Sequence, residues 1–257
     1  MKYICFSFLI IILYLVVTSF GGGSIAVADV GFDSTSTCPA SGGCGAPTTT
    51  HNITFTTRAT STAVVAGGNL GGVAISTITW ATSTSFTDIV ANASNDCARC
   101  MLYYVASSAT GTQSFTITKA GSDNASITAV SFNSTALTSD IVGSKATSTC
   151  SSCTALAMPL TSTRDGSMYV DNFTFNAGNP SAISVTGAGQ VLAVENAPFG
   201  DVQSRMSYKP VAVSGTSSTM SWSWTGASTA FIALAELRVV GAAVASDEAV
   251  ITTIIIE

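Results

Sequence analysis

Cysteines are the residues of this chain whose spacing could most readily support chemistry. Apart from Cys5, they form three close pairs: Cys38 and Cys44, Cys97 and Cys100, Cys150 and Cys153. In an oxidising compartment an even number of cysteines usually forms disulfides, and local pairing is the simplest arrangement here. The alternative is a tetrahedral zinc site built by both Cys-x-x-Cys motifs, Cys97, Cys100, Cys150 and Cys153. Disulfides are the favoured interpretation because exported thiolates oxidise unless metal binds first.

The other titratable residues form no catalytic constellation. His51 is the single histidine, and the chain has no Gly-x-Ser-x-Gly motif that would accompany a serine nucleophile. We therefore expect His51 to be an exposed residue at a strand edge. Asp165 with Asp171, or Asp123 with Asn124, could contribute oxygen ligands to calcium. Asp-Gly and Asp-Asn are foremost turn dipeptides, however, so no catalytic residue and no metal site is predicted.

Two tryptophans are the candidates for a ligand-stacking surface. Trp222 and Trp224 are two residues apart, so on a strand they share one face, as in a platform that stacks on sugar rings. The same spacing also builds the core of a sandwich. The serines on the alternate face favour the core interpretation, with glycan stacking as the alternative.

These candidates must be positioned by strands. Charged residues make up only 9% of the chain and hydrophobic residues 47%, while Ser and Thr supply the missing polarity. Threonine favours strands through its branched Cβ, and the scarcity of Lys and Glu leaves little from which to build amphipathic helices. The composition therefore predicts an all-β protein.

Alternating apolar and polar residues indicate where the half-buried strands lie. Strands are expected at 51–56, 73–80, 101–106, 113–119, 126–132, 167–175, 190–195, 220–225 and 230–240, with Gly and Asn turns between them. This spacing predicts a two-sheet antiparallel sandwich of jelly-roll type over residues 29–240. The alternation also fits an outer-membrane barrel, which the low charge and the six cysteines disfavour.

Both ends of the chain carry apolar segments. Lys2 followed by the uncharged run 3–20 predicts a signal peptide or an N-terminal membrane anchor within residues 1–28. Residues 241–257 end in a β-branched run too short to span a membrane as a helix. This tail is interpreted as a last strand, and the alternative is a strand lent to a neighbouring subunit.

Part of the chain resembles a known class of proteins. The aromatic-rich segment 101–106, the short glycine turn 107–111 and the alternating segment 113–119 resemble secreted bacterial β-sandwich proteins of the jelly-roll, concanavalin-like kind. Segments 165–171 and 220–236 are similar to them as well. The resemblance covers roughly residues 50–240. It implies this fold and export, and it implies little about activity because many of these proteins have no assigned one.

The net charge of −5, with nine Lys and Arg scattered singly, argues against a nucleic-acid partner. Taken together, the sequence predicts a secreted or cell-surface structural or adhesive protein without catalytic activity. Its expected partners are glycans or copies of itself, and membrane contact is expected only through the N-terminal segment. The alternatives are a carbohydrate-binding module and a filament subunit that exchanges its C-terminal strand.

Overall fold

The computed structural model describes residues 30–38, 47–58, 62–69, 73–81, 84–90, 101–107, 110–133, 135, 141–175, 180–196 and 203–238. All of them belong to one compact unit, Ala28–Gly241. The predicted signal segment (1–28), the tail (241–257), Cys44, Cys97 and Cys100 lie outside the described residues. Within the described ranges, no helix is long and apolar enough to cross a membrane.

The described chain is all-β, as predicted, with antiparallel strands throughout. The strands are β1 (Gly31–Thr37), β2 (Thr48–Thr57), β3 (Thr62–Asn69), β4 (Ile75–Trp80), β5 (Thr84–Ser85), β6 (Thr87–Val90), β7 (Met101–Ser107), β8 (Gly111–Asp123), β9 (Ser126–Asn133), β10 (Val142–Thr161), β11 (Ser167–Phe175), β12 (Ser181–Val185), β13 (Val191–Asn196), β14 (Ser204–Val211) and β15 (Ser217–Leu237). They form three hydrogen-bonded sheets where the sequence predicted two.

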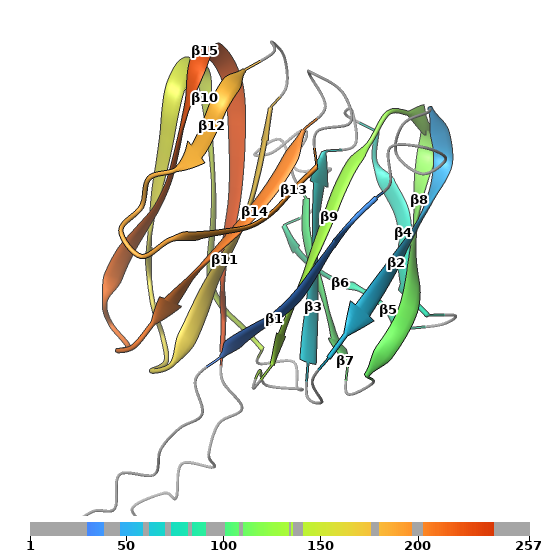
Figure 1. Ribbon diagram of the computed structural model, residues 1–257, viewed down its shortest axis with the longest axis horizontal. Helices are drawn as coiled ribbons and strands as arrows, with labels where there is room; N and C mark the ends of the chain where they lie inside the picture. The colour runs from blue at the N-terminus through green and yellow to red at the C-terminus, as the bar shows by residue number, and fades with distance from the viewer. Residues whose placement is uncertain are drawn as a thin grey trace, which may run out of the picture. The chain divides into compact units, whose positions relative to one another are not determined.

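The sheets stack around three apolar cores (Figure 1). Sheet β2-β8-β4-β5 packs on one face of sheet β1-β9-β3-β7-β6, and the sheet containing β11, β14 and β15 packs on the other face. Consequently β9 and β11 are buried on both faces over nearly their whole length. Both strands contain buried polar residues among their apolar ones, so the sequence pattern did not indicate that a further layer covers their second face.

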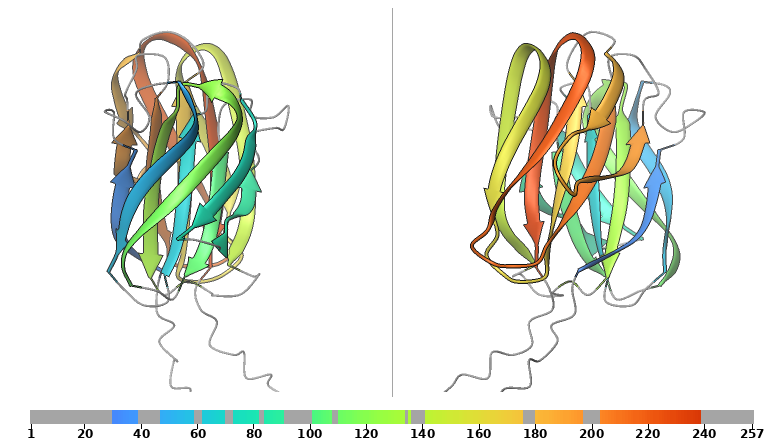
Figure 2. Two further views of the ribbon diagram at one scale, coloured as in Figure 1. Left: turned by 90° about the vertical axis from the view of Figure 1, so that its right-hand side faces the viewer. Right: turned by 60° about the vertical axis from the view of Figure 1, so that its left-hand side comes forward.

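The long ribbon of β10 and β15 folds over on itself. The two strands pair from Val142 with Leu237 to Thr161 with Ser217, and the register is interrupted on both sides of Cys153. Ser144 Oγ donates to Thr161 O at 2.8 Å, so the two ends of β10 lie together. Both strands turn back at the same end of the molecule (Figure 2). With β12, the returning half covers the third core as a further layer.

The two halves of the unit have the same topology. The strand order β1-β9-β3-β7-β6 recurs as β10-β15-β11-β14-β13. The partners Ala63 and Phe132 recur 105 residues later as Met168 and Leu237. A register shift within β6 recurs within β13. Residues 30–135 and 141–238 are therefore two structural repeats, named here the first and the second repeat.

Candidate functional site

The two candidate stacking tryptophans lie in the interior of the second repeat. Trp222 is fully buried, its ring stacks on Phe173 with centroids 4.7 Å apart, and its Nε1 donates to Asp171 Oδ2 at 2.8 Å. Trp224 is 5% exposed and packs against Phe173 and Phe175. Neither indole presents a ring face to solvent, so their positions fit the core interpretation and not a glycan-stacking platform.

The described cysteines are all disulfide-bonded. Cys150 and Cys153 are joined to each other at the point where β10 turns back. Cys38, which follows β1, is also disulfide-bonded. The Cys150–Cys153 bond fits the disulfide interpretation of this pair. Among the described residues, no three His, Cys, Asp or Glu side chains gather as a metal site would require.

His51 is not the exposed edge residue that was expected. It is fully buried, because the alternation of β2 places it on the same inward face as Ile53 and Phe55. The expectation was wrong because β2, although at the edge of its own sheet, is covered on one face by the neighbouring sheet.

The carboxylates considered for calcium serve the backbone instead. Asp165 Oδ1 accepts from Ser214 N at 2.6 Å, and Asp123 Oδ1 accepts from Asn124 N at 2.7 Å. The contact of Asp123 is local, with the next residue, whereas Asp165 connects its turn to another turn 49 residues later. Asp171, the suggested partner of Asp165, lies fully buried on β11.

Asp171 is the centre of a buried polar network that the sequence did not reveal. Its Oδ1 accepts from the backbone N of Ser207 at 2.8 Å and from Ser207 Oγ at 2.6 Å. Its Oδ2 accepts from Trp222 Nε1 and, at 3.4 Å, from Gln190 Nε2. Burial raises the pKa of Asp171 to about 7, while the hydrogen bonds from Ser207 and Trp222 oppose that rise. The sequence feature that could have indicated this network is the carboxylate of Asp171 within the segment of β11.

A second buried carboxylate, Glu236, holds the loop at Thr163 and Arg164 by hydrogen bonds. Its two oxygens accept from the backbone N of Ser144, Thr163 and Arg164 and from Thr163 Oγ1, at 2.7 to 3.1 Å. Burial would raise the pKa of Glu236, but the hydrogen bonds from Thr163 and Ser144 outweigh it and hold the pKa below its usual value. This carboxylate is therefore a structural anchor, with its acceptor positions already used.

A seam of buried amides joins the two repeats. Asn172 Nδ2 donates to Gly68 O at 3.1 Å and to Met101 O at 3.0 Å, and Asn69 Nδ2 donates to Phe175 O at 2.6 Å. Each repeat thus sends an amide from its central strand to the backbone of the other. A Cβ on Gly67 would lie within 2.8 Å of the Asn172 side chain, so this close approach needs glycine.

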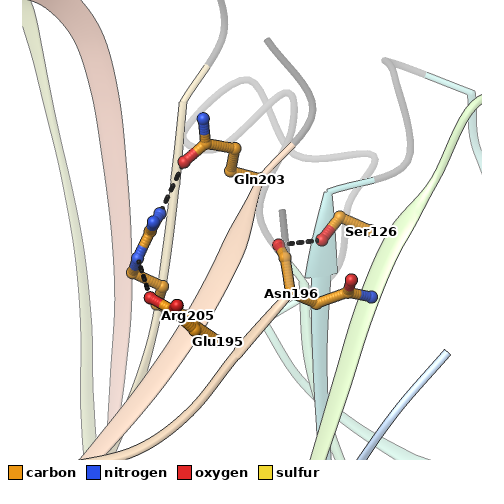
Figure 3. A network of polar contacts seen from close by, with 5 residues as sticks. All are labelled: Ser126, Glu195, Asn196, Gln203 and Arg205. Carbon is orange, nitrogen blue, oxygen red and sulfur yellow. Dashed lines mark hydrogen bonds and ion pairs between the residues drawn. The ribbon is translucent and has the colours of Figure 1, made fainter. Parts of the chain in front are cut away.

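The seam continues at the end of β13 (Figure 3). Asn196 O accepts from Ser126 Oγ at 2.6 Å, which ties the second repeat to β9 of the first. Nearby, Arg205 bridges two side chains: its Nε donates to Glu195 Oε2 at 3.2 Å and its Nη1 to Gln203 Oε1 at 2.6 Å. Burial lowers the pKa of Arg205, although Glu195 opposes this. The contact of Ser126 with Asn196 crosses between the repeats, while Arg205, Glu195 and Gln203 bind one another within the second repeat. The polar contacts of the seam therefore hold the two repeats together.

Comparisons with known proteins give no further identification. No family model, no curated protein and no solved structure matches the chain. The resemblance to secreted bacterial β-sandwich proteins therefore stays a prediction.

Proposed function

We propose that the chain is an exported, non-catalytic structural or adhesive protein of a cell surface, built from two fused sandwiches of jelly-roll type. The observation that carries the proposal is the seam of buried amides between the repeats. Asn172 alone joins β11 to the backbone of β3 and β7, and such satisfied buried networks rigidify a structure. A rigid double sandwich is suited to act as a spacer at a cell surface or to bear mechanical load there.

The outward faces of the outer layers support the same proposal. On sheet β2-β8-β4-β5, Thr56 and Thr112 hydroxyls are hydrogen-bonded across strands at 3.0 Å, and Thr116 donates to Asn52 at 2.7 Å. On the outer layer of the second repeat, Thr186 and Ser221 hydroxyls do the same at 2.9 Å. Hydroxyl-covered, uncharged faces remain hydrated without the charges that a nucleic-acid partner would require.

A carbohydrate-binding module is the second candidate, and one observation favours it. The first repeat has a cavity of about 240 Å³ bordered by aromatic and hydroxyl side chains. Filament formation by strand exchange depends on residues 247–257, which lie outside the described residues, and it stays a prediction.

Localisation tests the main proposal directly. The full-length chain carrying an epitope tag is expressed in bacteria, and intact cells are treated with an external protease. We expect peptides from residues 30–238 in the released fraction, and cells with the protein should adhere differently from cells without it. Retention of the whole chain in the cytoplasm would exclude a surface role, and identical adhesion would exclude an adhesive one.

A further inference from the structure

The cavity of the first repeat lies at the open edge of its sandwich. It is bordered by residues 75–78 of β4, by Ser85 of β5, by Phe86 and by Tyr103 of β7. The half-buried Tyr103 and the hydroxyl-bearing Ser76, Thr77 and Ser85 therefore border a space of about 240 Å³, while Phe86 is buried and packs against Trp80 and Phe115. That volume is below the range for drug-sized ligands, so it suits a single small ring.

The strand beside the cavity is irregular. The pairing of β4 with β8 shifts register between Ile75 and Thr77, which is a bulge at Ser76. Within the described residues, β5 pairs only with Thr79 and Trp80, so Ile75 to Thr77 have no strand partner on the side away from β8. Bulges re-aim side chains and are frequent beside binding sites. The edge thus offers backbone groups in addition to side-chain hydroxyls.

The second repeat provides an internal comparison. The residue just before β13 is Gln190, as Phe86 is the residue just before β6, and Ser207 occupies the position of Tyr103. Gln190 Nε2 donates to Ser207 Oγ at 2.7 Å, and its Oε1 accepts from Ser221 N at 2.8 Å. The second repeat therefore places a hydrogen-bonded amide at this position, whereas the first repeat places the ring of Phe86 there, packed against Trp80 and Phe115, with the cavity beside it.

We propose that this cavity binds one neutral pyranose unit, such as the end of a glycan chain. A pyranose has an apolar face that packs on aromatic rings and hydroxyls that pair with serine, threonine and backbone groups. The inference rests on the adhesive role proposed above, for which it names the partner.

The experiment is a titration of the full chain with methyl pyranosides of glucose, galactose, mannose and N-acetylglucosamine, followed by amide NMR shifts. About a dozen heavy atoms at ordinary ligand efficiency give a Kd near millimolar. We expect saturable shifts for residues 75–78, Phe86 and Tyr103 with at least one sugar. Thr77→Val, which removes one hydroxyl at constant size, should weaken binding roughly fivefold.

A matched pair of variants tests the location. Ser76→Phe fills the cavity from an exposed position, and Ser181→Phe adds the same ring at the exposed position 105 residues later, in the second repeat. We expect the first variant to lose binding and the second to bind like wild type, with both melting as wild type does. The proposal is overturned if no pyranoside shifts these residues, or if both variants bind equally. If glycan-coated beads retain Ser76→Phe cells as well as wild-type cells, the cavity is wrong while the adhesive role stands.

Discussion

The buried carboxylate of Asp171 should make the protein less stable at neutral than at mildly acidic pH. Asp171 is fully buried, and its pKa is raised from 3.8 to about 7 by burial. Between these two values the folded protein holds a proton that the unfolded chain releases. Unfolding free energy therefore falls as pH rises from about 4 to 7, and it is constant above that. The sign is the reverse of that for an ordinary salt-bridged aspartate.

The magnitude follows from the size of the shift. A rise from 3.8 to about 7 corresponds to roughly 4 kcal/mol between the acidic and the neutral plateau. An experiment that starts at pH 5 samples only the part up to about 7, roughly 3 kcal/mol, so with a urea slope of 2 to 3 kcal/mol per molar the unfolding midpoint should drop by roughly 1 M. Glu236 acts in the opposite direction, but its lowered pKa confines its titration to pH below the usual range of glutamate. The window from pH 5 to 8 therefore isolates Asp171 from Glu236.

The assay is urea unfolding monitored by tryptophan fluorescence, since Trp222 donates directly to this carboxylate. Asp171→Asn removes this titration, so its midpoint should fall much less between pH 5 and 8 than that of wild type. Ser207→Ala removes one donor to the carboxylate and should move the fall to higher pH. Asp165→Asn, at an exposed turn, should retain the wild-type slope. A wild-type midpoint that rises over this window, or an equal slope in Asp171→Asn, would refute the reasoning.

Three further perturbations test the joints of the fold. Asn172→Ala removes the side-chain amide that donates to the backbone carbonyls of Gly68 and Met101. The free energy of unfolding should therefore fall by about 2–4 kcal/mol. The control is Asn52→Ala at an exposed position, which should lower it by less than about 1 kcal/mol. Cys150→Ser opens the four-residue disulfide ring, which should cost about 2 kcal/mol and leave one free thiol detectable by alkylation and mass. Glu236→Gln should lower the melting temperature at pH 7. It should also reduce the loss of stability that wild type shows as pH falls below the ordinary glutamate value of 4.5, because the pKa of Glu236 is lowered and its carboxylate stabilises the fold only when ionised.

Strands with one solvent face were predictable from the sequence, since the expected segments 51–56 and 113–119 lie within β2 and β8. Segments 167–175 and 126–132 were also expected and correspond to β11 and, to within one residue, β9, but the cover on both of their faces was not predicted. Strand β10 was missed entirely, because most of its residues are small and polar and its half-exposed face gives no clear alternation. Strand β3 was missed as well, because Ala and Gly fill it where the two repeats approach closely. Small residues occur in this buried strand because other strands pack closely against it, and those neighbours cannot be identified from the local sequence pattern.

The candidate sites were less predictable than the strands. Spacing placed Trp222 and Trp224 on one face correctly, but whether that face is covered depends on how the β10 and β15 ribbon folds back. The same fold-back buries Asp171, which local reasoning placed at a possible calcium site. Burial of a given strand face is decided by contacts more than 50 residues away, as between Asp171 and Trp222.

The repeat could not be recognised from the sequence, because the two halves share strand order and register but not residue types. In the first repeat Asp33, on the bulge of β1, accepts from Ser131 Oγ and from Arg58 N. In the second repeat the carboxylate is Glu236, at the position of Ser131, and it accepts from the bulge of β10 and from Arg164 N. The carboxylate has changed strands while the loop it fastens has not. What both halves require is one acceptor between the bulge and the loop, and either strand can supply it. Function distinct from folding should therefore be sought where the two repeats differ in some other way. The main such difference is that the first repeat has a cavity beside Phe86, where the second repeat has the hydrogen-bonded amide of Gln190.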